Sequence, residues 1–473
     1  MSRNTKVRNM RNEYRYSFLW NFAVLILAAL AGYCILSTIG PIGSRTMLSL
    51  YVIDVGVTLF FMCCMEKYNI TISGIYESTV ITILSSIYTF CILTLINLIF
   101  FVSVDKFIID LCFMITKIVV IFLNDLLLAV IRGYEKFRKK PKLLVLGTFS
   151  KDFNRMKRIK YGVLKNYDSW YENVETMTLE KTKTFIHNEF IKYDAICILD
   201  GLSEEVYSEA VRRTMELNMD LFVVPKIIDV GKTNARLVRF DDVLTLYMPK
   251  KALSKPEQFV KRAVDVVLAS IGTLIALLPM VFIALAIKLT SPGPVFYSQV
   301  RLTKDKKEFN IYKFRTMVPD AEKLSGPKFA EKDDPRITPI GKILRACRLD
   351  ELPQILNILK GDMSIVGPRP ERPIFVEQFE KEIENYDYRF EVKAGLTSLS
   401  HVYGRYSTYI HDRTYYDLFY ITHYSLLLDF KIILLTTKTM FLKSAAEGED
   451  DFKVKTVAET SGEVESGANE YQA

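Results

Sequence analysis

Two acidic residues stand side by side at Asp350 and Glu351, and Pro353 follows them closely. Proline suits the first turn of a helix, whose amino-terminal end attracts anions. Neighbouring side chains on a helix point about 100° apart, so the two carboxylates can perform different tasks. One can act as a nucleophile while the other faces a metal ion. The alternative is that the pair only supplies acidic charge to a helix.

Arginines surround this acidic pair in short phrases. They are Arg315 in KFRTM, Arg336 in DDPR, Arg345 before the acidic pair and Arg369 in GPRP. Guanidinium groups form paired bonds to phosphate oxygens and keep their charge, so the phrases favour phosphate chemistry. In GPRP, proline stiffens a loop and glycine lets the backbone approach an anion. A surface ion pair of small energy is the alternative for any one arginine, and for Arg315 and Arg336 it has about equal weight.

A long apolar run at 265–287 precedes these phrases, and Pro279 lies past its middle. Proline removes a helical hydrogen bond and bends or breaks the helix. Basic residues flank the run on both sides, so charge gives it no external end. We therefore expect a re-entrant membrane helix over 261–288, with a break at Pro279 and both ends on one side. A kinked helix that crosses the bilayer is the alternative.

Four further apolar segments open the chain, and each is long enough to cross a bilayer. They are residues 17–38, 47–65, 78–103 and 107–131. Basic residues precede the first segment and follow the fourth, which predicts that both ends are cytoplasmic. A cleaved signal peptide does not fit, because the first segment is too long and three more follow.

Charged and polar residues interrupt these segments: Asp54, Asp110, Lys117, Asn124 and Asp125. Charge inside a membrane can mark a transport path. We favour the alternative that these residues lie near helix ends or pair within the bundle.

Short apolar runs alternate with helical stretches after residue 141. The runs are 142–149, 193–200 and 221–225, and 203–219 has helical character. This rhythm predicts a Rossmann-like α/β domain with a parallel sheet. Only one glycine follows the first run, so the G-x-G-x-x-G pattern is absent. A structural or regulatory role is favoured over dinucleotide chemistry.

Composition supports a membrane protein and argues against other classes. Half of the 473 residues are hydrophobic, and the mean hydropathy is +0.15. The net charge is +8, and an acidic tail at 444–473 leaves the rest of the chain strongly basic, which suits lipid headgroups and phosphates. No nucleic-acid motif appears. Seven cysteines without a CxxC pair indicate reduced thiols, and neither they nor the four scattered histidines suggest a zinc site.

The phrases SPGPVFYSQVR, IYKFRTM and DDPRITPIGKILRACRLDELPQILNILKGDMSIVGPRP follow one another in order. Here the chain resembles the bacterial sugar transferase family, the monotopic polyprenyl-phosphate phosphoglycosyl transferases. The resemblance covers residues 255–444, and the preceding regions resemble those of the long, multi-domain members. The expected domains are a cytoplasmic basic arm at 1–16, a four-helix transmembrane bundle at 17–131, the Rossmann-like domain at 141–250, a mostly helical catalytic domain at 255–443 and a disordered tail at 444–473.

The resemblance implies a function. A hexose 1-phosphate would pass from a UDP-sugar to undecaprenyl phosphate with release of UMP, at the cytoplasmic face of the bacterial inner membrane. Asp350 would carry the covalent intermediate, Glu351 would help to bind Mg²⁺, and Arg345 and Arg369 would bind phosphate, with Arg315 and Arg336 as further candidates. The product would begin an exopolysaccharide, capsule or O-antigen, and the enzyme would be a homodimer.

One phrase departs from the family. Members often carry VKPGLTGLWQVSGR, whereas this chain has VKAGLTSLSHVYGR at 392–405. The matching Gly404 and Arg405 are candidates for substrate binding. Ser400 replaces a large aromatic residue, which puts the nucleotide or sugar preference in doubt and leaves phosphoryl transfer in place. Two rival functions stay open: a nucleotide-sugar sensor without turnover, and a conventional glycosyl transferase that releases UDP.

Overall fold

The structure is a computed structural model of the chain. It describes residues 20–30 in part, 44–67, 75–100, 104–135, 142–147, 168–318, 334–404 and 410–441, with short interruptions at 175–176, 200, 226, 234, 241–242, 248–252 and 384. The chain forms two compact units, one with residues up to Lys226 and the other beginning at Ile227. Each unit is described by itself.

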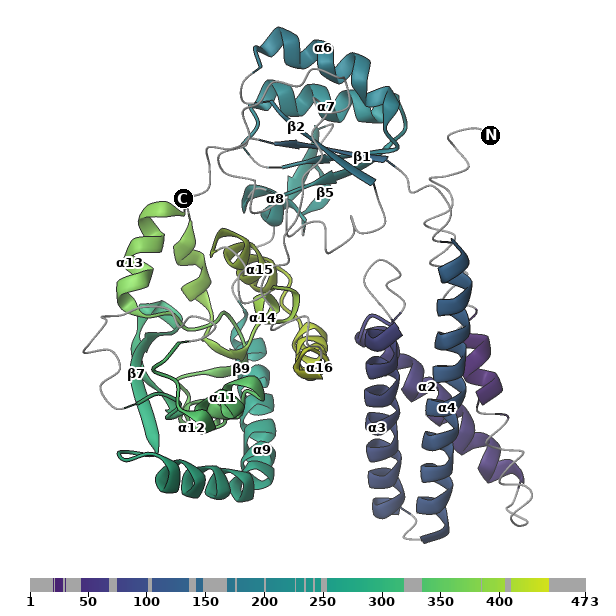
Figure 1. The fold of residues 1–473 in the computed structure, drawn as a ribbon, viewed down its shortest axis with the longest axis vertical. Helices are drawn as coiled ribbons and strands as arrows, with labels where there is room; N and C mark the ends of the chain where they lie inside the picture. Colours follow the sequence, from purple (N-terminus) through teal and green to yellow (C-terminus); the bar gives the residue numbers. More distant parts are fainter. Residues whose placement is uncertain are drawn as a thin grey trace. The chain divides into compact units, whose positions relative to one another are not determined.

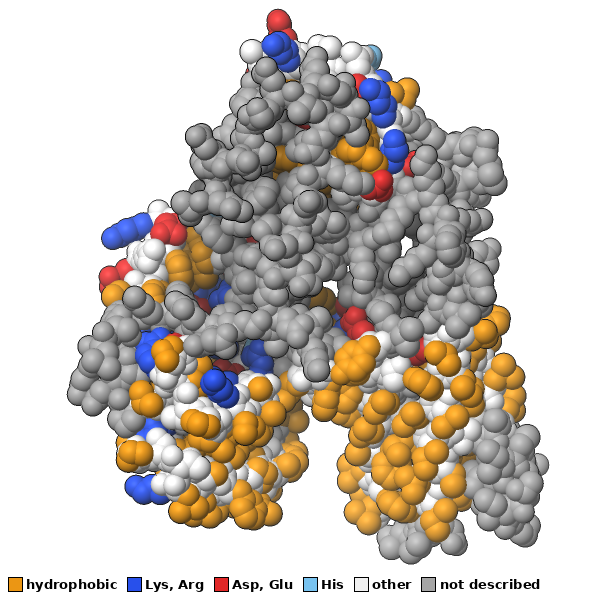
Figure 2. Space-filling model, in the orientation of Figure 1, with side chains coloured by type: hydrophobic (Ala, Val, Ile, Leu, Met, Phe, Trp, Pro, Cys, Tyr) orange, Lys and Arg blue, Asp and Glu red, His pale blue; other side chains and the backbone are white. Residues whose placement is uncertain are grey.

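Three long apolar helices belong to the first unit (Figure 1): α2 (Ser44–Cys64), α3 (Ile75–Phe100) and α4 (Val104–Glu135). Within them, Tyr76–Ile96 and Phe107–Leu127 are long and apolar enough to cross a bilayer, and Val52–Cys64 is a shorter apolar stretch. Figure 2 shows hydrophobic side chains gathered on the visible face of these helices. Most of the first predicted segment, 17–38, lies outside the described residues, so the four-helix bundle stays a prediction.

Buried ion pairs join these helices. Lys117 of α4 donates to Asp54 of α2 at 2.6 Å and to Thr58 at 3.0 Å. Lys67, just after α2, lies 3.1 Å from Asp125 of α4. Among the predicted polar residues, Asn124 also has a partner, because it accepts a hydrogen bond from Trp20 at 2.8 Å. The expectation that such residues find partners among these helical segments is confirmed for Asp54, Lys117, Asn124 and Asp125.

A parallel sheet also belongs to the first unit. Its strands, in the order β2-β1-β3-β4, are β1 (Lys142–Gly147), β2 (Asp168–Asn173), β3 (Ala195–Ile198) and β4 (Asp220–Val223). Leu144, Leu146, Ile196 and Ile198 pack with residues of α6 (Leu179–Glu189) and α7 (Glu204–Glu216), which lie on one side of the sheet in Figure 1. Strands at all three predicted apolar runs are confirmed. The polar edge strand β2 had not been predicted.

The second unit begins with α8 (Ile227–Lys232) and an antiparallel hairpin of β5 (Arg236–Phe240) and β6 (Val243–Tyr247). The 36-residue helix α9 (Lys255–Thr290) follows, and Ser254 and Glu257 form a capping box at its start. Pro279 lies inside α9, and Figure 1 shows that the helix changes direction before it reaches β7. Only 11% of its most apolar window is buried against protein. The predicted bend is present, and return to one side of the membrane stays a prediction.

Short elements follow α9, and several of them pack against it. They are β7 (Phe296–Leu302), β8 (Glu308–Phe314), α11 (Pro339–Ala346), η4 (Leu349–Glu351), α12 (Gln354–Lys360), β9 (Ser364–Val366), α13 (Pro373–Glu382), η5 (Tyr386–Glu391), β10 (Gly395–Thr397), α14 (Leu399–Tyr403), α15 (Ile410–Thr422) and α16 (Leu426–Phe441). β7 and β8 form an antiparallel hairpin, and β9 pairs with β10 in parallel. Ala269 of α9, Ile311 of β8 and Ile358 of α12 share one hydrophobic core.

Candidate functional site

The acidic pair lies in η4, a single turn between α11 and α12. The chain reverses at Arg348, whose backbone is left-handed with φ 55°, and Asp350 and Glu351 follow. Pro353 is the N-cap of α12, so the carboxylates precede a helix start as the sequence predicts. Asp350 is buried, with 8% of its surface exposed. The backbone therefore holds both carboxylates at the amino-terminal end of a helix, where anions are favoured.

Two basic side chains converge on Glu351. Lys313 of β8 donates to its Oε1 atom at 2.7 Å, and Nη2 of Arg369 lies 3.4 Å from the same oxygen. Burial alone would raise the pKa of Glu351, but the charges of Lys313 and Arg369 outweigh it and hold this pKa well below its usual value. Glu351 is therefore a carboxylate in a basic surrounding.

The pKa of Asp350 is shifted in the opposite direction, above its usual value. Burial raises its pKa, and the nearby negative charge of Glu351 acts in the same direction. Lys313, Arg345 and Arg369 oppose that rise. A carboxylate that is poorly hydrated yet balanced by positive charge suits nucleophilic attack on an anionic substrate.

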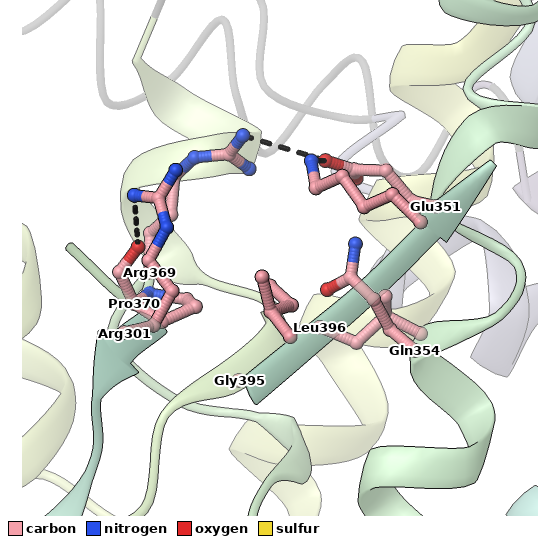
Figure 3. A pocket seen from close by; sticks show the side chains of 9 residues that line it. Arg301, Glu351, Gln354, Arg369, Pro370, Gly395 and Leu396 are labelled. Atoms are coloured by element: carbon pink, nitrogen blue, oxygen red, sulfur yellow. Dashed lines mark hydrogen bonds and ion pairs between the residues drawn. The ribbon is translucent and has the colours of Figure 1, made fainter. Parts of the chain in front are cut away.

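A small pocket adjoins the pair (Figure 3). Its lining residues are Arg301, Ile311, Lys313, Glu351, Gln354, Arg369, Pro370, Gly395 and Leu396. Arg301 and Arg369 lie on one side of the hollow and Glu351 on the other. Sequence reasoning missed Arg301 and Lys313 as functional residues. Polar and basic groups from β7, β8 and the GPRP loop thus meet around one space next to the acidic pair.

Asn357 fixes the distance between β8 and α12. Its side chain is fully buried, accepts a hydrogen bond from Tyr312 N at 3.0 Å and donates to Asn310 O at 2.7 Å. The Asn357 amide thus provides hydrogen-bond partners for the backbone of β8 on the edge that does not face β7. Lys313 follows Tyr312 in β8, and Glu351 lies just before α12. The hydrogen bonds of Asn357 between β8 and α12 therefore support the contact between Lys313 and Glu351.

Arg345 extends from α11 towards the site. Its Nε atom donates to Thr316 Oγ1 at 3.1 Å, and its charge acts on both Asp350 and Asp334. Close packing positions α11, because a Cβ atom at Gly341 would clash with the carbonyl of Thr316. The structure thus brings Arg345 and Arg369 together with the acidic pair.

The other two predicted arginines have internal partners. Arg315 is buried and donates to the carbonyls of Pro292 and Ser291 at 2.7 and 2.8 Å, where α9 ends. Arg336 donates to both carboxylate oxygens of Asp334, two residues before it. That pairing lowers the pKa of Asp334 to about 2. Arg336 thus forms an ion pair, as in the alternative to phosphate binding, whereas Arg315 is buried and binds backbone carbonyls instead of a carboxylate. Phosphate binding by these two arginines stays a prediction.

The phrase at 392–405 also lies beside the site. Burial and the charges of Arg348 and Arg369 lower the pKa of His401 to about 3, so this ring is neutral beside the basic groups. Ser400, at the position of the usual aromatic residue, donates to Asp417 at 3.4 Å. Gly404 caps the end of α14. Arg405 lies outside the described residues, and substrate binding by both stays a prediction.

Asp350 and Glu351 are the side chains at this site that could hold a divalent metal ion. No group of three His, Cys, Asp or Glu side chains gathers among the residues that the structure describes. Mg²⁺ commonly uses one or two carboxylates together with substrate phosphates and water, so Asp350 and Glu351 fit that need. Both basic contacts fall on Oε1 of Glu351, which leaves its Oε2 atom for a metal. Asp362 follows Gly361, which ends α12 with φ 99°, so Asp362 lies in the turn after that helix.

The second unit thus joins a long, bent, apolar helix to a pair of carboxylates among basic side chains, an arrangement compatible with a membrane protein. Residues 256–443 match the family described as bacterial sugar transferase. The chain is 30% identical over 382 residues to galactosyl transferase CpsE of Streptococcus agalactiae serotype III, a match that covers 69% of this chain and 80% of the relative. The chain belongs to the bacterial sugar transferase family.

Two further relatives have more explicit names. A UDP-N-acetylgalactosamine-undecaprenyl-phosphate N-acetylgalactosaminephosphotransferase of Aeromonas hydrophila is 36% identical over 253 residues, 53% of this chain and 59% of the relative. A UDP-glucose:undecaprenyl-phosphate glucose-1-phosphate transferase of Escherichia coli strain K12 is 33% identical over 320 residues, 66% of this chain and 65% of the relative. The matches span less than two thirds of both relatives.

Proposed function

We propose that this protein transfers a hexose 1-phosphate from a UDP-sugar to undecaprenyl phosphate and releases UMP. One observation carries the proposal: buried Asp350 stands beside Glu351, and Lys313 and Arg369 meet on Glu351 at 2.7 and 3.4 Å. A nucleophile and a cluster of positive charge are what attack on a diphosphate needs. The names of the relatives support this donor and acceptor.

The reaction proceeds in two displacements. A carboxylate oxygen of Asp350 attacks the phosphorus that bears the sugar, and the bond from that phosphorus to the bridging oxygen breaks. The electron pair leaves with UMP, and the sugar phosphate is then an acyl phosphate on Asp350. A phosphate oxygen of undecaprenyl phosphate attacks the same phosphorus, which frees the carboxylate and forms the lipid diphosphate sugar. Two steps of this kind avoid direct contact between two anionic substrates.

The basic residues supply charge where the reaction needs it. Arg369 and Arg345 would bind phosphate oxygens of the donor, and Arg301 adds a third guanidinium at the wall of the pocket. Lys313 keeps Glu351 ionised through their 2.7 Å contact. Fixed donors of this type stabilise negative charge without reorganisation during the reaction.

Glu351 is the residue that we expect to hold Mg²⁺, with Asp350 close by. When bound there, the ion would neutralise part of the charge of the diphosphate. The proposal needs only one protein carboxylate, because Mg²⁺ retains water and accepts substrate phosphate oxygens.

The membrane arrangement is part of the proposal. We propose four crossings by 17–38, 47–65, 78–103 and 107–131, and a re-entrant α9, with the catalytic domain at the cytoplasmic face of the bacterial inner membrane. The apolar, largely protein-free surface of α9 and its internal Pro279 support this arrangement. The product would begin an exopolysaccharide, capsule or O-antigen, and a homodimer is the proposed assembly.

The test uses the full chain in detergent or proteoliposomes with undecaprenyl phosphate, Mg²⁺ and a panel of UDP-sugars. We expect release of UMP with at least one donor. Release of UDP would instead show a conventional glycosyl transferase, and no turnover with any donor would favour a sensor.

The nucleophile is tested in the same assay. Asp350→Asn should reduce UMP release by at least roughly 1000-fold, as removal of a nucleophile does in other enzymes. Asp362→Asn is the control, because Asp362 lies in the turn after α12 and should leave turnover within about twofold. With donor labelled in the sugar-bearing phosphate, label should bind the protein at Asp350. Ordinary turnover by Asp350→Asn would refute the assignment.

A further inference from the structure

The GPRP loop that contains Arg369 is itself held by two arginines. Arg389 of η5 donates through Nη2 to the carbonyl oxygen of Arg369 at 2.8 Å. Arg301 of β7 donates through Nη1 to the next carbonyl, that of Pro370, at 3.1 Å. Two consecutive carbonyl groups are thus fixed by side chains from two different elements.

Arg389 is set apart by its burial. Its side chain is 4% exposed, and that of its partner Asp417, on α15, is 2% exposed. The same Nη2 atom lies 2.9 Å from Asp417 Oδ2, while Nη1 donates to the hydroxyl of Tyr386, which is also buried. The guanidinium is thus held by protein groups on both of its terminal nitrogens. We therefore expect Arg389 to act on the reaction through the residues that it contacts.

The other end of the loop is fixed by backbone pairing. Gly367 N donates to Thr397 O at 3.0 Å, and Gly395 N donates to Pro368 O at 2.9 Å. A Cβ atom at Gly367 would clash with the carbonyl of Lys393, so only glycine allows this approach. With both ends held, the backbone from which the side chain of Arg369 projects is fixed in place.

We propose that Arg389, held by Asp417 and Tyr386, is a positioning residue that aims Arg369 at the donor diphosphate. The proposal rests on the proposed function, because it assigns Arg369 to phosphate binding there. Arg389 itself does not touch the substrate. It sets the backbone of Arg369, and Arg369 provides the charge that meets Glu351 and the phosphates. The cost of disturbing Arg389 should therefore depend on the presence of the Arg369 side chain.

A double-mutant cycle tests this dependence. Arg389→Lys keeps a positive charge for Asp417 but loses the planar guanidinium that reaches three acceptors. We expect it to lower kcat/KM for the UDP-sugar by roughly 10- to 100-fold, as displacement of a positioning group can. In an Arg369→Ala background the same change should cost less than about threefold, because no guanidinium remains to be aimed.

Arg315→Lys is the matched control. Arg315 is likewise buried and binds two carbonyls, but these belong to Ser291 and Pro292 at the end of α9. Its cost should be the same with and without Arg369→Ala, because its contacts are separate from the GPRP loop. Additive costs indicate a general loss of packing. A cost that depends on the Arg369 side chain indicates that the variant has displaced that side chain. Thermal unfolding of every variant in detergent shows which ones fold.

The outcomes separate the two proposals. If the wild-type chain releases no UMP, the proposed function fails. If the wild type turns over and Arg389→Lys costs as much in the Arg369→Ala background as without it, the positioning role is overturned. Should Arg389→Lys not fold, Tyr386→Phe replaces it, because it removes one hydroxyl that supports Arg389. That variant should show a smaller loss with the same dependence on Arg369, and an additive loss would again overturn the role.

Discussion

Lys313 and Arg369 reach the same oxygen of Glu351 from two separate elements, β8 and the GPRP loop. The side chain of Lys313 is 20% exposed and that of Glu351 12%, so the contact is partly shielded from water. Shielding strengthens it relative to a surface ion pair. The contact is therefore a sensitive point for activity.

Lys313→Met should lower kcat/KM by roughly 100-fold, since it removes one preorganised donor from a charged site. Without that lysine, burial of Glu351 is less well compensated, so the pKa of Glu351 should also rise. UMP release over a range of pH measures both effects. Lys360→Met is the control, because Lys360 is 61% exposed and pairs only with the turn residue Asp362 in the described part of the chain. Equal activity of the two variants would contradict the role of Lys313.

Individual residues were predicted to different degrees. Asp350, Glu351, Arg345 and Arg369 could be found because short phrases and a proline mark their places. Arg301 and Lys313 could not be found by phrase alone, because their importance comes from strand pairing. Lys313 lies on the same face of β8 as the buried Phe309 and Ile311, and a lysine on that apolar face was the available signal. Internal partners such as the carbonyls bound by Arg315 depend on folding and have no local signature.

His401 gives a prediction for pH. Burial and nearby arginines lower its pKa from the usual 6.5 to about 3. Between these values the unfolded chain binds a proton that the folded chain does not, so His401 makes folding less favourable as pH falls below about 6.5. His401→Gln lacks this proton and should lose less Tm between pH 7 and pH 5 than the wild type. Thermal unfolding at both values measures the difference, and parallel losses would contradict it.

At the scale of elements, the bent α9 and the βα rhythm were both visible in the pattern of apolar residues and proline. The edge strand β2 was not, because DSWYEN lacks the apolar run that marks a buried strand. The hairpin of β7 and β8 was also not predicted. Its partly exposed side chains hide the alternation, and Asn357 of α12 covers part of its edge only after folding. Strands that depend on distant partners have weak local signals.

The buried pair between α2 and α4 leads to a prediction about the bundle. Lys117→Met would leave Asp54 unpaired. The side chains of Lys117 and Asp54 are only 1% and 3% exposed, so the unpaired carboxylate would stay buried. Loss of one partner of a buried pair costs about 3–5 kcal/mol. Unfolding in detergent should reveal this loss, and the double variant Asp54→Leu with Lys117→Met should restore most of it. If the double variant were as unstable as the single one, the pair would not be the cause.

At the scale of the whole molecule, one compact unit contains apolar helices and a parallel sheet, and the other, which begins at Ile227, contains the candidate site. The sequence predicts the kinds of structure present. The start of the second unit could not be read from it, because α8 and the hairpin of β5 and β6 follow the sheet without a marked change in composition. The relatives are named for three different sugars, so family membership alone does not identify the sugar donor. The panel of UDP-sugars is the experiment that identifies it.

The thinly covered surface of α9 has a kinetic consequence. With 11% of its most apolar window packed on protein, this helix would keep the enzyme at the bilayer, where the proposed acceptor lipid also resides. The two then meet by lateral diffusion in two dimensions, and the relevant acceptor concentration is its mole fraction in the lipid. Adding inert phospholipid at constant enzyme, acceptor and donor should slow UMP release in proportion to that dilution. An enzyme that met its acceptor from bulk water would keep its rate.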